Sequence, residues 1–199
     1  MGSNGRRVGV LALQGDFEAH GRALAARGVA AVEVRTVGDL AGISGLVLPG
    51  GESTTMLTLM AEDGLGDRLV ELVRGGLPVL ATCAGVILAA REVRRPAQRS
   101  LGLLDAVVER NAYGRQRDSA VVPLAACAGE ELEGRQLEGV FIRAPIVREV
   151  GRDVHVLARR GDDPVLLRQG RLLAATFHPE LSAGSPVIEL FIRSLRSQQ

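Results

Sequence analysis

Hydrophobic positions in the first half of the chain form short runs of Val, Leu and Ile, and these runs alternate with stretches of helical period. This pattern predicts buried strands joined by covering helices, the βαβ arrangement of a mostly parallel sheet. Glu18–Ala26 and Leu65–Val73 repeat apolar residues three and four apart, which predicts amphipathic helices. The predicted strands of this half are Val8–Leu13, Val32–Arg35, Gly45–Leu48 and Pro78–Thr82.

From about residue 104 the strand candidates follow one another closely, which predicts antiparallel hairpins added to the sheet. They are Ala106–Glu109, Ser119–Pro123, Gly139–Arg143, Val154–Ala158, Pro164–Arg168 and Leu172–Phe177. The last amphipathic segment, Ser185–Ser197, opens with Ser-Pro, a favourable N-cap and first-turn pair, and predicts a closing helix. The expected fold class is α/β, with a mostly parallel central sheet and added antiparallel strands in the C-terminal half.

Composition limits the partners more than it limits the fold. The 199 residues are 46% hydrophobic and 24% charged, as in ordinary globular proteins. Without an internal repeat or a long linker, we expect one domain over residues 1–199, with residues 1–6 as a disordered lead. The formal net charge of +1 argues against a dedicated nucleic-acid or membrane partner. No signal-peptide pattern and no membrane-length apolar run is seen, so we expect a cytoplasmic protein.

All 24 basic side chains are arginines, which excludes chemistry that depends on a lysine imine or on a P-loop lysine. The two cysteines, Cys83 and Cys127, cannot make a disulfide framework, and a reducing compartment follows. The three histidines are scattered along the chain, so the sequence predicts no metal site. For Cys127 we expect a structural or incidental role.

Cys83 lies where an apolar strand meets a helical segment, predicted as Val86–Arg95. A cysteine on such a sharp turn resembles a nucleophile elbow, and the small neighbours Ala84 and Gly85 leave its sulfur accessible. The helix N-terminus supplies a partial positive charge and amide donors that favour a thiolate and can bind an oxyanion. The alternative interpretation is an inert cysteine at the end of a core strand.

A nucleophilic cysteine needs a base, and His178 in the sequence His-Pro-Glu is the strongest candidate. Proline after a histidine favours an extended backbone, which lets His178 and Glu180 point the same way, so that Glu180 orients the imidazole. The alternative is a merely polar turn. We expect His20 and His155 to be surface or packing residues.

A glycine-rich turn, Pro49–Thr54, follows one strand and precedes a helical run. Its paired glycines allow an amide to approach a ligand, and Ser53 is a candidate N-cap for the following helix. A second oxyanion donor is expected here. The alternative is a structural strand-to-helix turn, and no dinucleotide-binding fingerprint is present.

In this order, Pro49–Ser53, Thr82–Gly85 and His178–Glu180 resemble the motifs of the class I (triad) glutamine amidotransferases. More narrowly, the chain resembles the glutaminase subunits of pyridoxal 5′-phosphate synthases. That similarity is carried by Leu13–Asp16, Gly50–Met56, Val108–Gln116 and Val140–Pro145.

The resemblance implies a flavodoxin-like three-layer α/β/α fold and the hydrolysis of L-glutamine to L-glutamate and ammonia. Ammonia would pass to a separate synthase subunit that makes the vitamin B6 coenzyme, while this chain holds no cofactor. By the same resemblance, Cys83 forms a thioester, His178 transfers protons and Glu180 orients His178. The oxyanion hole is implied at the amides of Gly51 and Ala84. Glutamine binding is implied at Gly51, Glu52, Ser53, Arg110, Ile142 and Arg143.

Other interpretations remain open at this point. Arg110 and Arg143 are alternatively solvated strand residues or partner contacts. A glutaminase serving another synthase would share the triad but lack the segments 108–116 and 140–145. The runner-up function is an elbow-cysteine hydrolase or redox-sensing protein on a similar α/β fold, and a third interpretation is a non-catalytic interaction subunit. We expect the isolated chain to be a poor glutaminase until a partner docks.

Overall fold

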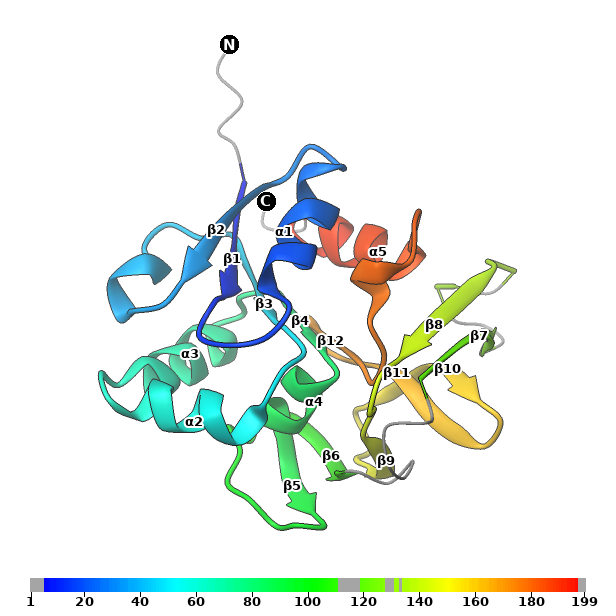
Figure 1. Ribbon diagram of the computed structural model, residues 1–199. Coiled ribbons are helices and arrows are strands. Elements are labelled where there is room, and N and C mark those ends of the chain that lie inside the picture. Colours follow the sequence, from blue (N-terminus) through cyan, green and yellow to red (C-terminus); the bar gives the residue numbers. More distant parts are fainter. Residues whose placement is uncertain (1–5, 111–118, 128–130, 133, 197–199) are drawn as a thin grey trace.

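The computed structural model describes residues 6–110, 119–127, 131–132 and 134–196 (Figure 1). Of the expected disordered lead, only Arg6 falls within these residues. The helices are α1 (Phe17–Ala25), α2 (Ser53–Ala61), α3 (Leu65–Arg74), α4 (Ala84–Ala89) and α5 (Pro186–Ser194), with short 3-10 helices η1 (Val37–Leu40) and η2 (Pro179–Leu181). The strands are β1 (Arg7–Leu11), β2 (Ala30–Val34), β3 (Gly45–Leu48), β4 (Val79–Thr82), β5 (Ala90–Arg94), β6 (Leu104–Glu109), β7 (Ala120–Ala126), β8 (Leu137–Phe141), β9 (Ile146–Val150), β10 (His155–Arg160), β11 (Asp163–Gln169) and β12 (Leu172–Ala175).

The main sheet has two parts that differ in strand direction. Within the described residues its strand order is β2-β1-β3-β4-β12-β11-β10-β7-β8. The first five strands in this order, β2, β1, β3, β4 and β12, are parallel. The other four, β11, β10, β7 and β8, are added antiparallel. The expected mostly parallel sheet with antiparallel additions in the C-terminal half is therefore confirmed.

Two apolar layers cover the two faces of the parallel part, because successive side chains of a strand point to opposite faces. Val10, Val47, Leu80 and Leu173 form one row across four strands by direct pairing. This row belongs to the core cluster that also contains Leu24 of α1 and buried apolar residues of α5 such as Phe191. The opposite face packs against α2, α3 and α4. Figure 1 shows these two groups of helices on the two sides of the sheet, which makes the fold a three-layer α/β/α arrangement.

A second sheet, β5-β6-β9, corrects two expectations. The helix predicted over Val86–Arg95 is wrong, since α4 ends at Ala89 and the next five residues form β5. The physical reason is tertiary: Glu92 and Val93 pair with Val107 and Val108 of β6, and this ladder outweighs the local helical pattern. Strand β9 was not predicted at all.

The carboxyl ends of the parallel strands place the candidate residues. Cys83 follows β4, His178 lies three residues beyond β12, and the glycine turn follows β3. Since β3, β4 and β12 are adjacent and parallel, these three segments meet at one edge of the sheet. In open α/β sheets this is the edge at which ligands bind.

Candidate active site

Cys83 occupies a strained turn between β4 and α4. Its φ of 47° and ψ of −106° lie in a region that residues other than glycine rarely adopt, and its side chain is buried. The backbone N–H of Cys83 donates to the carbonyl of Ala175 at the end of β12, 2.9 Å away. The thiol faces the carbonyl of Ile142, with 3.7 Å between Sγ and O. The sharp strand-to-helix turn expected at this position is confirmed.

His178 is held by its ring and by its backbone. Its N–H donates to the carbonyl of Val140 in β8 over 2.8 Å, and its Nδ1 lies 2.7 Å from Oε1 of Glu180. The local conformation differs from the extended one expected, because Pro179 and Glu180 are part of the 3-10 helix η2. The 3-10 conformation of Pro179 and Glu180, not strand alternation, brings the carboxylate back to the imidazole.

Charge in this group is set by burial and by close partners. Burial disfavours the imidazolium, but hydrogen bonds to Cys83 and Glu180 and the charges of both outweigh it and raise the pKa of His178 from 6.5 to about 10. Burial also opposes ionisation of Glu180, yet the charge of His20 and hydrogen bonds from His178 and His20 lower the pKa of Glu180 from 4.5 to about 2. At neutral pH the pair is therefore an imidazolium and a carboxylate.

His20 is a member of this cluster that the sequence did not predict. It is 1% exposed on α1, so the packing role was correct, but its Nε2 lies 3.0 Å from Oγ1 of Thr82 and 3.3 Å from Oε1 of Glu180. The available signal was helical period, because His20 is four residues before the buried Leu24 and shares its face. His155, by contrast, is exposed on β10.

The glycine turn after β3 lies against the histidine. A Cβ at Gly50 would be 2.5 Å from Cε1 of His178, so only glycine fits beside the ring. Gly51 adopts φ +149°, and the N–H of Glu52 donates to Oε1 of Gln14 over 2.5 Å. Gln14, a second residue that was given no role from the sequence, thereby braces the turn.

Four of the six expected glutamine-binding residues form two linked pairs at this edge. Nη1 of Arg143 lies 3.9 Å from Oε1 of Glu52, and both side chains are exposed to solvent. Gln98, also missed, accepts hydrogen bonds from the hydroxyl of Ser53 and from Arg110, so it joins these two residues. The expected N-cap at Ser53 is wrong, because Glu52 holds that position and Ser53 begins α2.

Two other expectations concern α4 and the arginine-bearing segment. Ala84 is the first residue of α4, and a helix leaves the N–H of its first residue without a partner inside the helix. Residues 111–116 of the segment 108–116 lie outside the described residues.

Among the described residues, no three His, Cys, Asp or Glu side chains gather as metal ligands would. The part of the chain described here contains no helix of the length and apolarity that crossing a membrane requires.

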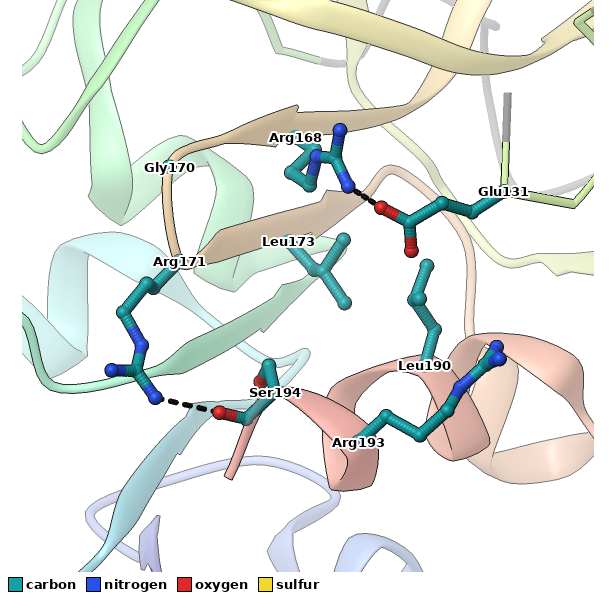
Figure 2. A pocket seen from close by; sticks show the side chains of 8 residues that line it. All are labelled: Glu131, Arg168, Gly170, Arg171, Leu173, Leu190, Arg193 and Ser194. Atoms are coloured by element: carbon teal, nitrogen blue, oxygen red, sulfur yellow. Dashed lines mark hydrogen bonds and ion pairs between the residues drawn. The ribbon is translucent and has the colours of Figure 1, made fainter. Parts of the chain in front are cut away.

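A cavity of about 460 Å³ lies at the other edge of the sheet, between the β11–β12 turn and α5 (Figure 2). Two of the three arginines that line it contact groups of the protein itself. Arg168 pairs with Glu131, and Arg171 donates to the carbonyl of Ser194 over 2.6 Å. Because this cavity is at the start of β12 and Cys83 is beside the end of that strand, it is separate from the candidate active site.

Comparison with known proteins identifies relatives along nearly the whole chain. The pyridoxal 5′-phosphate synthase subunit PdxT of Solibacter usitatus is 51% identical over 194 residues, which are 96% of this chain and 100% of that protein. The subunit of the same name from Thermus thermophilus is 53% identical over 178 residues, 88% of this chain and 90% of its own.

Solved structures agree in fold. A crystal structure described as a glutamine amidotransferase superimposes with a TM-score of 0.86 at 47% identity, covering 94% of this chain and 98% of the other. The structure of PurLQS from Thermotoga maritima gives a TM-score of 0.69 at 17% identity over 96% of this chain and 99% of the matched one, a likeness of fold alone. The model of the SNO glutamine amidotransferase family matches residues 10–197. This chain belongs to the SNO glutamine amidotransferase family.

Proposed function

We propose that this chain hydrolyses L-glutamine to L-glutamate and ammonia and supplies the ammonia to the synthase subunit of a pyridoxal 5′-phosphate synthase. The observation that carries the proposal is the line of side chains from Glu180 through His178 to Cys83, buried where the three strand ends meet. Relatives named as PdxT support it, since they match 96% of the chain at about half identity. The whole chain is proposed to act as one glutaminase domain.

Cys83 is the proposed nucleophile. With its proton transferred to His178, Sγ attacks the amide carbon of glutamine and forms a tetrahedral oxyanion. The C–N bond then breaks, and His178 gives its proton to the leaving nitrogen, which departs as ammonia. Water attacks the resulting thioester while His178 accepts one of its protons. Glutamate leaves, and Cys83 is restored.

Glu180 is proposed to keep His178 in the orientation that these proton transfers require. Its contact at Nδ1 leaves Nε2 as the ring nitrogen for the sulfur and the leaving group. The raised pKa of His178 supports the same role, because the imidazole retains a proton for the departing ammonia at neutral pH.

The proposed oxyanion donors are the backbone amides of Gly51 and Ala84. Ala84 offers the free N–H of a helix start next to the sulfur. Gly51 is in a turn that contacts His178 through Gly50. Two amides from different elements would bind the developing negative charge from two sides.

Substrate recognition is proposed at the two linked pairs. Glutamine brings an ammonium, which Glu52 can bind, and a carboxylate, which an arginine fork of Arg110 or Arg143 can bind. The Glu52–Arg143 pair is solvent-exposed and 3.9 Å long, so the charged groups of the substrate can replace it at low cost. Gly51, Ser53 and Ile142 complete the proposed binding set.

The synthase partner follows from what this chain lacks. A sequence of 199 residues without lysine cannot hold a sugar or pyridoxal phosphate as a lysine imine, so that chemistry belongs to the partner. The balanced charge supports the absence of nucleic-acid and membrane partners, and the two free cysteines support a reducing, cytoplasmic location.

The test is glutamate release from L-glutamine by the full chain, with and without the synthase subunit of the same organism. We expect Cys83→Ala to lower release by at least about 1000-fold, because no other group forms the thioester. Cys127→Ala is the matched control and should retain release, since Cys127 lies just beyond β7, away from the cluster. Glutamate release that survives Cys83→Ala, or is absent from the wild-type complex, would refute the proposed function.

A further inference from the structure

His20 contacts both sides of the proposed catalytic group, although it belongs to neither motif. Its Nε2 is 3.3 Å from Oε1 of Glu180 and 3.0 Å from Oγ1 of Thr82, the residue before Cys83. The His20 side chain is 1% exposed and the Glu180 side chain 0%, so water does not compete for these contacts. Helix α1 thus reaches the site from another layer of the fold.

The direction of the contact to Glu180 is fixed by chemistry. An ionised carboxylate has only acceptors, so the contact with Glu180 needs the proton on Nε2 of His20, and this single N–H is shared with Oγ1 of Thr82, the nearer acceptor at 3.0 Å. Within the described residues, Nδ1 of His20 is buried without a hydrogen-bond partner. The polar contacts of the ring therefore all pass through Nε2, and the ring cannot turn away without leaving Glu180.

Glu180 depends on this donor. Oε1 lies between Nδ1 of His178 and Nε2 of His20, whereas Oε2 is buried without a partner among the residues that the structure describes. A fully buried carboxylate held by a single donor is costly and free to rotate. The contact with the His20 imidazole therefore holds the Glu180 carboxylate in the position from which it contacts His178.

We propose that His20 is a positioning residue of the glutaminase reaction: its Nε2–H holds Glu180 against His178 and links that carboxylate to Thr82 beside the nucleophile. This proposal rests on the proposed function. His20 acts through Glu180 and does not touch the substrate. Because a misplaced catalytic group costs rate and not substrate affinity, its removal should lower kcat and leave KM unchanged.

The test replaces His20 by residues that differ in reach and in hydrogen bonding. Leucine fills a similar space without a donor, whereas the amide nitrogen of glutamine reaches about the position of Nε2. We expect His20→Leu to lower kcat of the chain in complex with its synthase subunit by about 10- to 100-fold, with KM within about twofold. His20→Gln should recover most of kcat. If His20→Leu does not fold, His20→Asn takes its place, because its shorter amide is polar but does not reach Glu180.

A second readout separates positioning from packing. Ring ¹⁵N NMR should give a lower pKa for His178 in His20→Leu than in the wild type, because a displaced Glu180 stabilises the imidazolium less. In His20→Gln the wild-type pKa of His178 should return. His155→Gln, at an exposed strand position, controls for the loss of a histidine. It should change neither kcat nor the pKa of His178.

The outcomes distinguish this inference from the proposed function. A wild-type complex that releases no glutamate refutes the function. A wild-type complex that is active, with a folded His20→Leu variant that keeps the wild-type kcat and the wild-type pKa of His178, overturns the inference alone. Equal loss of kcat in the leucine and glutamine variants also overturns it, because the donor would then have no role.

Discussion

At the scale of single residues, the site depends on one carboxylate that has no contact with solvent. Glu180 keeps its charge because two imidazole nitrogens lie within 3.3 Å of Oε1. Against the opposing effect of burial, the hydrogen bond to Cys83 and then the hydrogen bond and charge of Glu180 raise the pKa of His178. The pKa of His178 is raised and the pKa of Glu180 is lowered on folding. The stability of the folded chain therefore depends on pH, and the two contributions are both complete only in a limited pH range.

Glu180→Gln should reduce stability most between about pH 4.5 and 6.5. The pKa of His178 is raised from 6.5 to about 10, so its contribution is complete below 6.5 and is lost as the pH rises through 10. The pKa of Glu180 is lowered from 4.5 to about 2, so its contribution is complete above 4.5 and is lost as the pH falls toward 2. Thermal unfolding of both proteins across this range measures the difference.

The same variant should lower the pKa of His178 by about one unit or more, as measured by ring NMR, because it removes the neighbouring negative charge. Glu33→Gln is the control. It breaks an exposed pair with Arg35 and should change stability by less than about 0.5 kcal/mol at any pH. A difference in unfolding temperature that does not vary with pH would contradict the linkage.

At the scale of elements, the angle between β4 and α4 depends on how closely α4 approaches β3. A Cβ at Gly85 would be 2.0 Å from the carbonyl oxygen of Leu48, which is a backbone atom and cannot rotate away. The absence of a side chain at Gly85 therefore sets the position of the helix whose first residue follows Cys83. The turn at Cys83 is a consequence of this contact as well as of its own φ.

Gly85→Ala should destabilise the chain by about 1–3 kcal/mol, because the methyl group forces α4 away from β3. Urea denaturation measures this loss, and glutamate release should fall with it as Cys83 is displaced. Gly21→Ala is the matched control inside α1, where an added Cβ meets nothing within 4 Å. That variant should gain about 0.5–1 kcal/mol from helix propensity. Equal effects of the two substitutions would refute the packing argument.

At the scale of the whole molecule, one aromatic contact joins the parallel part of the sheet to its antiparallel addition. Phe177, just after β12, packs on Phe141 of β8 with ring centroids 5.6 Å apart, and both are fully buried. His178 follows directly and donates its N–H to β8. The histidine is therefore placed by the junction of the two parts and not by either part alone.

Phe177→Ala should cost about 3–5 kcal/mol in urea denaturation, because a large ring is removed from a closed core. The loss at this junction should also lower kcat, since the next residue is the proposed base. Val121→Ala on β7 is the control, with 61% of the residue exposed, and should stay within about 0.5 kcal/mol of the wild type. If Phe177→Ala were as stable as the wild type, the contact between Phe177 and Phe141 would not be what joins the parallel part of the sheet to its antiparallel addition.

The sequence by itself determined the layers and the site motifs, because both are local. Alternating apolar runs define strands, helical period defines the covering helices, and a cysteine between a strand and a helix predicts an elbow without knowledge of distant residues. Cys83 lies on that turn, and Nδ1 of His178 lies 2.7 Å from Oε1 of Glu180, a contact that was expected from an extended backbone and that the 3-10 helix η2 makes instead.

Only the tertiary structure decided what depends on residues far apart in the chain. Pairing with β6 turned the predicted end of a helix into β5, because a sheet ladder outweighs local propensity. The contact of His20 with Glu180 joins residues near opposite ends of the chain and arises only when α1 packs on the sheet. Gln98 joins Ser53 to Arg110 for the same reason. Burial and hydrogen bonding at these points are properties of the packed chain, which periodicity and motif spacing do not contain.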